Sequence, residues 1–525
     1  MSLPFIIALA VMQVAFAGKS TKPNIVMIVA DDLGWNDVSF HGSAQIPTPN
    51  IDMLANSGVI LNSYYVTPIC SPSRSAIMTG KYPIHTGMQT STVFAPNAWG
   101  IDPKEVLLPQ YLKSQGYKTH AVGKWHLGMC SEEYLPNKRG FDSFYGYYLG
   151  KSDYWDHSDL ETYWGLDLHD NGKPVQNQWG NYSTEMYTAI GIDKIRKHNI
   201  SEPLFLYLAY QAVHSANRRA DPIQAPDYWI KKFNHIKNIG RRKFAAVTAA
   251  LDDAVGKVYA AIKQAGMLEN TVIVFTTDNG GPANGFDYNY ASNYPLRGVK
   301  AHLWEGGVRG VAFVHSELLS KPGRVSNDLL HITDWLPTFY KLAGGDPKAV
   351  KNLDGFNVWE TVSSAEASPR TEVLLNIDPL LYKNAALRVG KYKVICGESG
   401  YWSGWFPPPG EGEDFFSPIA TYEDAVIKCG PKPAGFTKDC SKKHGPCLFD
   451  IEKDPCEYTD VSKDYPEILA ALLDRLAAYQ ESMVTPRNNF TDDPLSNPKL
   501  HGGSWEPWIA TTSKTENVID NSSFQ

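Results

Sequence analysis

The stretch Asn24-Ile-Val-Met-Ile-Val-Ala30, followed directly by Asp31-Asp32, decides the fold of this 525-residue chain. A continuous apolar run without alternation predicts a strand that is buried on both faces, as in parallel sheets covered by helices. Similar runs predict further strands, and helix-like stretches between them predict the covering helices. The expected strands lie at 119–122, 203–210 and 270–277, and the expected helices follow Pro49 and span 106–115 and 241–265. This alternation predicts an α/β fold with a large, mostly parallel sheet flanked by helices.

Polar side chains follow each predicted strand at its carboxyl end. In chain order these residues are Asp31 and Asp32, then Lys124 and His126, then His214, and finally Asp278 and Asn279. The carboxyl ends of parallel strands lie along one edge, and open α/β sheets bind their ligands there. We therefore expect these side chains to converge on one site.

The members of this set with oxygen donors are typical of the site of a hard metal ion. Asp31, Asp32, Asp278 and Asn279 offer oxygen ligands and have no Cys or His pair beside them, which suits Ca²⁺ or Mg²⁺ better than Zn²⁺. Each pair alone is compatible with a helix cap or a turn. Because both pairs end predicted buried strands, a metal site is the better interpretation.

Basic residues, in this set and elsewhere in the sequence, suit an anionic ester. Arg74, Lys124 and Lys300 could hold the charged oxygens of a transferred group, and His126 or His214 could protonate a leaving alkoxide. Taken alone, Lys300 is compatible with a solvated surface charge, and His126 with an internal hydrogen bond beside Trp125. The net charge of −7 argues against a nucleic-acid-binding protein, so an anionic substrate has to be attracted by this local cluster.

The first 17 residues predict a secretory signal peptide. An apolar stretch leads to Ala15-Phe16-Ala17, a small-x-small cleavage site, and the stretch is too short to span a membrane. Four sequons predict glycosylation, at Asn181, Asn199, Asn489 and Asn521. These features predict a protein of the secretory pathway, lysosomal or secreted, without a membrane span.

The cysteines agree with that route. Apart from Cys70, the chain has an even number suited to disulfides: Cys130, Cys396, Cys429, Cys440, Cys447 and Cys456. Five of the six follow residue 390, so a small C-terminal region is expected to be cross-linked. One bridge has to reach Cys130 unless two cysteines stay free.

The character of the sequence changes near residue 384. A hairpin is expected over 386–395, followed by a Gly/Pro/Cys-rich stretch and an amphipathic helix from Pro466 to about Met483. We expect a signal peptide at 1–17, a catalytic α/β domain at 18–383, and a small domain at 384–525. The small domain should consist of an antiparallel sheet, one helix and a Pro/Asn-rich tail.

Two motifs resemble the type I sulfatase family. Cys70-Ser-Pro-Ser-Arg-Ser-Ala76 resembles its first signature, and Gly116-Tyr-Lys-Thr-His-Ala-Val-Gly-Lys-Trp-His126 resembles its second. The resemblance extends from Pro23 to about Met483 and is strongest to the arylsulfatase B (N-acetylgalactosamine-4-sulfatase) branch. The chain departs from that branch in its cysteines and in the loops at 88–105 and 150–182, where substrate walls are expected. The resemblance implies an alkaline-phosphatase-like fold.

The resemblance also implies a mechanism. A formylglycine-generating enzyme converts Cys70 into an aldehyde, whose hydrate attacks the sulfur of a sulfated carbohydrate or an aryl sulfate. One Ca²⁺ is held by Asp31, Asp32, Asp278, Asn279 and residue 70. His214 and Lys300 protonate the leaving oxygen and grip the sulfate. His126 then acts as the base that releases sulfate from residue 70, while Arg74 and Lys124 hold the formylglycine.

Other functions remain compatible with the sequence. The same core could serve a dietary or detoxifying sulfatase, for example one acting on glucosinolates. A non-catalytic extracellular glycoprotein that binds sulfated glycans is a further alternative, although it would gain nothing from keeping Cys70 and His126. A phosphatase or phosphonate hydrolase is less favoured, because the additional Asp and His ligands of two-zinc sites are not found in the sequence.

Overall fold

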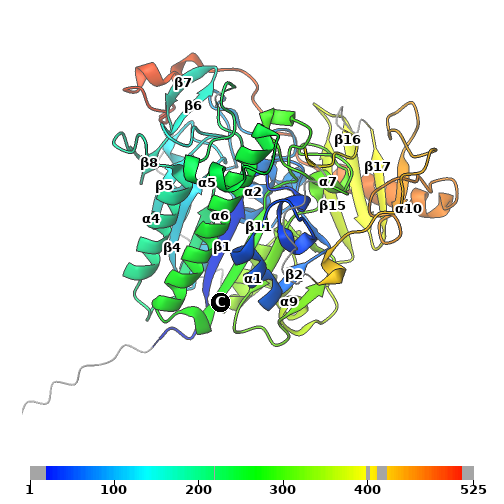
Figure 1. Ribbon diagram of the computed structural model, residues 1–525, viewed down its shortest axis with the longest axis horizontal. Coiled ribbons are helices and arrows are strands. Elements are labelled where there is room, and N and C mark those ends of the chain that lie inside the picture. The colour runs from blue at the N-terminus through cyan, green and yellow to red at the C-terminus, as the bar shows by residue number, and fades with distance from the viewer. Residues whose placement is uncertain (1–18, 218, 398–402, 411–421, 511–525) are drawn as a thin grey trace, which may run out of the picture.

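A ten-stranded sheet forms the centre of the molecule in the computed structural model, which describes residues 19–217, 219–397, 403–410 and 422–510 (Figure 1). In spatial order the strands are β13 (Arg324–Ser326), β2 (Val59–Leu61), β12 (Ala312–His315), β11 (Thr271–Thr277), β1 (Asn24–Ala30), β10 (Leu204–Ala209), β4 (Lys118–Lys124), β5 (Ser143–Tyr147), β8 (His169–Asp170) and β9 (Lys173–Pro174). The five strands from β11 to β5 are all parallel, and antiparallel strands flank them on both sides. The expected α/β fold with a large, mostly parallel sheet is confirmed.

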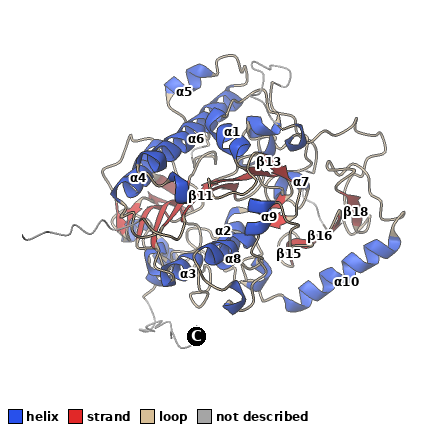
Figure 2. Ribbon diagram, turned by 90° about the horizontal axis from the view of Figure 1, so that it is seen from below, coloured by secondary structure: helices blue, strands red, loops and turns tan. Residues whose placement is uncertain are grey.

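Helices cover both faces of this sheet (Figure 2). One face carries α1 (Pro49–Ser57), α4 (Ser183–Lys197), α5 (Asp227–Lys232) and α6 (Ile239–Gln264), and the other carries α2 (Cys70–Thr79), α3 (Leu108–Ser114), α8 (Trp335–Leu342) and α9 (Trp359–Ser364). The central strand β1 divides its side chains between the two layers. Val26 and Ile28 pack in the cluster with α6, whereas Met27 and Val29 pack in the cluster with α2 and α8. Burial on both faces explains why this strand reads as a continuous apolar run.

The second sheet has four antiparallel strands in the order β15-β16-β17-β18. The strands are β15 (Glu372–Asp378), β16 (Asn384–Val389), β17 (Tyr392–Cys396) and β18 (Cys447–Asp450). Helix α10 (Pro466–Ser482) packs on this sheet through Leu472, Leu476 and Tyr479 (Figure 1). The expected hairpin and helix are therefore confirmed, and the sheet also recruits β15, which precedes residue 384.

Shorter elements complete the described chain. Two-stranded ribbons are formed by β3 (Tyr64–Tyr65) with β14 (Leu330–His331) and by β6 (Ser158–Glu161) with β7 (Tyr163–Leu166). The short helix α7 (Glu305–Val308) leads toward β12. Within the described residues, no helix combines the length and apolarity needed to cross a membrane. The predicted signal peptide and Asn521 lie outside the described residues.

Two disulfides cross-link the C-terminal region, Cys429–Cys456 and Cys440–Cys447. Cys130 and Cys396 are free. A bridge reaching back to Cys130 is therefore not formed, and the alternative in which two cysteines stay unpaired is the one observed.

Candidate active site

The register of the parallel strands brings distant parts of the chain together at one edge. Ala30 of β1 pairs with Thr277 of β11, so Asp31 and Asp278 emerge next to each other. On the other side of β1, the strands β10 and β4 end in register with it, and Ala209 pairs with Gly123. The predicted convergence at the carboxyl ends follows from this pairing.

The three carboxylates of the cluster are fully buried and individually paired. Asp31 accepts a hydrogen bond from Lys124 Nζ at 2.6 Å, and Asp32 accepts one from Lys300 Nζ at 2.8 Å. Asp278 accepts from Arg74 Nε and Nη2 at 3.0 and 2.8 Å. Burial, followed by the nearby Asp31, raises the pKa of Asp278. Each buried negative charge thus has a buried cation as its partner, as charges in an interior require.

Cys70 is the first residue of α2 and is only 2% exposed. Burial raises the pKa of its thiol to about 12, although Lys124 and Lys300 act in the opposite direction. A thiol with such a pKa stays protonated at neutral pH and is a weak nucleophile. The encoded cysteine is therefore poorly suited to act unmodified. Arg74 lies one turn further along the same helix.

The acidic residues fit a metal ion. Ligand atoms of Asp31, Asp32, Cys70 and His214 all lie within 4.8 Å of one another. Asp31 Oδ1 and Asn279 Oδ1 are buried oxygens with no hydrogen-bond partner among the described residues. Unpartnered buried acceptors are costly, and coordination to a cation would satisfy them. Because oxygens of Asp31, Asp32 and Asn279 outnumber the sulfur of Cys70 and the nitrogen of His214, the set suits Ca²⁺ or Mg²⁺.

His126 and His214 approach the cluster as neutral imidazoles. Burial, followed by nearby lysines, holds the pKa of each well below its usual range. His126 Nε2 donates to Val93 O at 3.0 Å, which leaves the buried Nδ1 as an acceptor without a partner in the described chain. His214 Nδ1 donates to Ser215 O at 2.7 Å, and its Nε2 accepts from Lys300 Nζ at 3.0 Å.

Lys300 belongs to the buried cluster, not to the surface. The residue is 5% exposed, and its ammonium group lies between Asp32 and His214. Burial is the largest single effect and lowers the pKa of Lys300, but Asp32, Cys70, Asp287 and Asp31 together outweigh it and raise the pKa well above its usual range. Lys300 is therefore a cationic hydrogen-bond donor at neutral pH.

Two of the clustered residues have left-handed backbone conformations. Asp32 has φ 64° and His126 has φ 60°. Such conformations are uncommon for residues with a Cβ and often mark functional sites. They hold the side chains of both residues at the edge of the sheet.

Two further residues join the site without having been predicted. Asp287 Oδ2 lies 3.6 Å from both Lys300 Nζ and His214 Nε2. Ser71 Oγ donates to His126 O at 2.9 Å and accepts from Val93 N at 3.2 Å, so it fixes the segment around His126. Ser71 could have been proposed from its place beside Cys70, whereas Asp287 lies in an irregular loop that has no sequence signal.

The described sequons are at the surface. Asn181, Asn199 and Asn489 are all exposed, as a glycan acceptor requires.

Comparisons with known proteins agree with this architecture. A family model described as Sulfatase matches residues 23–345. Arylsulfatase J of Mus musculus is 41% identical over 518 residues, which cover 94% of this chain and 82% of the relative. N-acetylgalactosamine-6-sulfatase of Rattus norvegicus is 30% identical and covers 94% of this chain and 92% of its own length. The crystal structure of Ps i-CgsB in complex with k-i-k-neocarrahexaose has a TM-score of 0.73 and 28% identity, covering 96% of this chain and 100% of its own.

Proposed function

This chain belongs to the sulfatase family, and from that premise we propose that it hydrolyses sulfate esters through a formylglycine made from Cys70 and a bound Ca²⁺. The observation that carries the proposal is the set of paired charges around Cys70. Three buried cations, two neutral histidines and two unpartnered oxygens, of Asp31 and Asn279, surround one buried residue. A site that only bound a glycan would not need that combination at the start of a helix.

Residues at the carboxyl ends of β1 and β11 would hold the ion together with residue 70. Asp31, Asp32, Asp278 and Asn279, together with residue 70, would be its ligands. When present, formylglycine supplies a hydrated aldehyde as the nucleophile, and Ca²⁺ supplies positive charge beside the sulfate oxygens. Arg74 donates a hydrogen bond to Asp278, and Lys124 donates one to Asp31. These two cations would therefore keep residue 70 and Asp31 in place.

Lys300 and His214 would protonate the leaving alkoxide. Lys300 Nζ donates to His214 Nε2, so a proton can pass between these atoms toward the departing alkoxide. The ammonium group also neutralises charge on the transferred sulfate. Asp287 orients this pair from the loop above.

His126 would act as the base that releases sulfate. Its Nδ1 is an unprotonated, buried acceptor, and hydrogen bonds from Ser71 and to Val93 fix its position. A base held in this way can remove a proton from residue 70.

The proposed substrate is a sulfated carbohydrate. The relatives include an N-acetylgalactosamine-6-sulfatase by name and a protein solved with k-i-k-neocarrahexaose. We keep N-acetylgalactosamine 4-sulfate, the substrate implied by the resemblance to arylsulfatase B, as the first sugar to test, with aryl sulfates as small reporters. The exposed sequons and the two disulfides support a location in the secretory pathway, lysosomal or secreted, where a formylglycine-generating enzyme would act on the chain.

The test combines chemistry and activity on the same preparation. Peptide mass spectrometry across residues 70–76 should show the thiol replaced by an aldehyde or its hydrate. The same protein should release sulfate from 4-nitrocatechol sulfate, and Cys70→Ala should abolish that release. An unmodified thiol in protein that nevertheless turns over would contradict the formylglycine. A modified residue without turnover on any sulfate ester would contradict the proposed reaction.

A further inference from the structure

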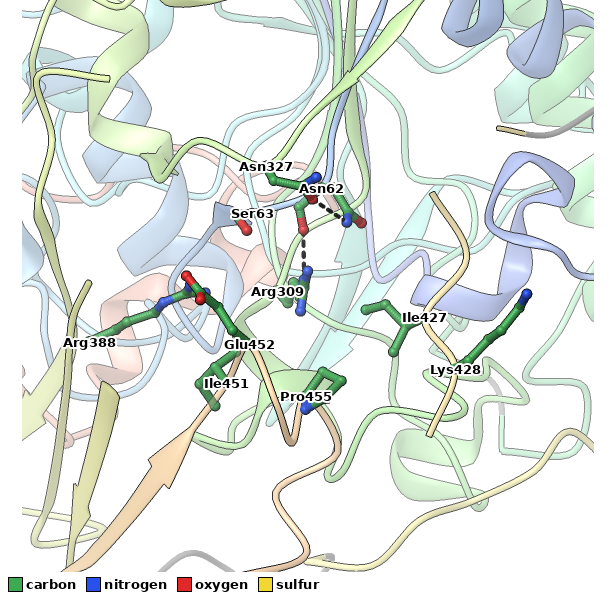
Figure 3. A pocket seen from close by; sticks show the side chains of 10 residues that line it. All are labelled: Asn62, Ser63, Arg309, Asn327, Arg388, Ile427, Lys428, Ile451, Glu452 and Pro455. Carbon is green, nitrogen blue, oxygen red and sulfur yellow. Dashed lines mark hydrogen bonds between the residues drawn. The ribbon is translucent and has the colours of Figure 1, made fainter. Parts of the chain in front are cut away.

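A cavity of about 360 Å³ lies apart from the catalytic cluster, where residues of both sheets meet (Figure 3). Its walls come from the segment after β2, from Arg309 after α7, and from Arg388 on β16. Segments 427–428 and 451–455 close the other side. Cavities of this size at the junction of two structural units are typical ligand sites.

Two buried arginines form the cationic wall of this cavity. Arg309 is 6% exposed, and its Nε donates to Asn62 O at 2.8 Å. Arg388 is 5% exposed and donates to Gly390 O and to the hydroxyl of Tyr65. Neither Nη2 group donates a hydrogen bond within the part of the chain that the structure describes. Both guanidinium groups are thus held in position and keep a donor available for a ligand, a geometry that suits sulfate or carboxylate oxygens.

The charges behind this wall balance only through one exposed carboxylate. The buried cations are Arg309, Arg388 and Lys393, and the buried carboxylates that contact them are Glu305 and Glu457. Among the described residues that line the cavity, the single carboxylate is the exposed Glu452, which acts electrostatically on Arg388. Solvent screens an exposed carboxylate, so an anionic ligand inside the cavity would offset the buried charge of Arg388 more completely.

The cavity also offers a site for a hydroxyl group. Asn62 is 7% exposed, and its amide nitrogen donates to Asn327 Oδ1 at 2.7 Å and to Asp424 O at 3.2 Å. Its Oδ1 is buried and accepts no hydrogen bond from any described residue. An inorganic anion has no donor for this oxygen, whereas a sugar has several hydroxyl groups.

A second cavity of about 620 Å³ continues from the first and shares Ile427 and Lys428 with it. Trp405, Tyr294, Tyr458 and Lys432 contribute to its lining, and no carboxylate occurs among its described lining residues. Trp405 packs against Tyr458 with 4.9 Å between ring centroids, and Lys432 Nζ lies 5.2 Å from the Trp405 ring. Arg297 also lies over the Trp405 ring, at 4.6 Å, so the aromatic face open to a sugar ring is that of Tyr294, which is 37% exposed. The lysines favour anionic substituents.

We propose that these two cavities together, here termed the basic groove, bind an anionic oligosaccharide outside the catalytic cluster. A sulfate or carboxylate group of one sugar lies between Arg309 and Arg388, with a hydroxyl on Asn62. Neighbouring sugars follow Lys428 and Lys432 across the aromatic side chains. The proposal rests on the proposed function and extends it, because it assigns the protein a sulfated polymer as its partner rather than a small ester. The arginine pair alone would also accept free sulfate, and the experiment separates the two sources.

The experiment measures binding on protein that cannot turn over. Full-length Cys70→Ala protein is titrated with a chondroitin 4-sulfate hexasaccharide, and separately with sodium sulfate, by isothermal titration calorimetry. The test variant adds Lys428→Glu and Lys432→Glu, two exposed positions at which folding should be unaffected. The matched control adds Lys197→Glu and Lys257→Glu, which makes the same change in net charge. Lys197 and Lys257 are exposed and each pairs with one carboxylate on its own helix, much as Lys428 pairs with Glu423.

We expect the test variant to bind the hexasaccharide at least about tenfold more weakly, equivalent to about 1.4 kcal/mol, and the control to stay within about twofold. Adding Arg388→Gln should weaken binding further. No binding by the starting protein, or equal losses in test and control variants, would overturn the proposal. Sulfate that binds as tightly as the hexasaccharide would reassign the groove to free anions.

Activity separates this inference from the proposed function. In protein that retains Cys70, the Lys428→Glu/Lys432→Glu change should leave the kcat/KM for 4-nitrocatechol sulfate within about twofold of the unmutated value. A failure of the proposed function would abolish this turnover in the unmutated protein and leave hexasaccharide binding intact. If the groove does not bind the polymer, the unmutated protein should still turn over 4-nitrocatechol sulfate but should not bind the hexasaccharide.

Discussion

At the scale of single residues, burial keeps several histidines neutral, and the consequences differ with their surroundings. His126 and His214 keep an accepting nitrogen next to buried lysines, so neutrality prepares them for proton transfer. His41 is 4% exposed and stacks on Trp35 with 3.7 Å between ring centroids, and burial lowers its pKa to about 3. At His126 and His214 the neutral ring serves the proposed chemistry, whereas at His41 it makes the stability of the folded protein depend on pH.

Replacing His126 by Ala should separate the two halves of the reaction. Because the proposed base acts only when sulfate leaves residue 70, the variant should release one equivalent of 4-nitrocatechol rapidly. Steady-state turnover should then be at least about 100-fold slower. Rapid-quench or stopped-flow measurement of the nitrocatechol burst checks this. His120→Ala removes a partly buried histidine within the preceding strand and should leave the steady-state rate near normal. A His126→Ala enzyme that turns over normally would exclude this residue as the base.

His41→Phe should make the protein less sensitive to acid. The folded state binds the His41 proton about 3.5 pH units more weakly than a free histidine with pKa 6.5. The unfolded state therefore gains protons as pH falls below 6.5, and the stability of the folded state is lost over that range. Between pH 7.5 and 5 the unmutated protein should lose about 2 kcal/mol relative to the Phe variant. Urea unfolding at both pH values measures the difference, and parallel losses in the two proteins would contradict it.

At the scale of elements, the site is a product of strand register. Asp31 and Asp278 are 247 residues apart in the sequence, yet the pairing of β1 with β11 makes them neighbours. The continuous apolar runs predict these strands well, because burial on both faces leaves a strong signal. Strands of two residues, such as β8 and β9, leave none, and the antiparallel strands on either side of the parallel core were not predicted. Helix α3 begins at Leu108, two residues later than expected.

Calcium should stabilise the folded protein by joining the loops after β1 and β11. Ca²⁺ at about 100 times its dissociation constant would add about 2.7 kcal/mol to the free energy of unfolding. Differential scanning fluorimetry should therefore show a higher Tm in calcium than in EGTA. Asp278→Asn should lose most of the shift, whereas Asp252→Asn, at a buried carboxylate on α6, should keep it. Equal Tm values in calcium and EGTA would rule out a structural contribution from the ion.

At the scale of the whole molecule, two kinds of sheet are stabilised in different ways. The large sheet is covered by helices on both faces, whereas the small sheet packs α10 in one cluster and the segment of Leu303, Trp304 and Val308 in another, with the disulfides nearby. The change in sequence character near residue 384 falls inside the small sheet and not at its start, because β15 precedes it. The arrangement of the loops could not be predicted from the sequence. Asp287 and Lys300 reach the site through the irregular segment 284–300, whose path is set by tertiary contacts alone. The resemblance identified Lys300, and no pattern identified Asp287.

Mild reduction should loosen the C-terminal region before the large sheet and its helices. Each disulfide contributes about 2–4 kcal/mol to the segment it closes, and both lie between Cys429 and Cys456. After treatment with a phosphine reductant, limited proteolysis should cut within 422–456, while turnover of 4-nitrocatechol sulfate persists. A Cys130→Ser/Cys396→Ser variant, which lacks only free cysteines, should behave like the unmutated protein. Loss of activity in step with cleavage would show that the two regions unfold together.

Because Cys70 is buried in the folded protein, the proposed chemistry requires it to be modified before the chain folds. With 2% of its surface exposed at the start of α2, the side chain is out of reach of any other enzyme once the chain has folded. Under the proposed chemistry, oxidation and folding therefore compete for the same nascent chain. A molecule that folds first is well ordered and permanently inactive. The specific activity of a preparation would then record how its chains were made, and no later treatment of the native protein could restore it.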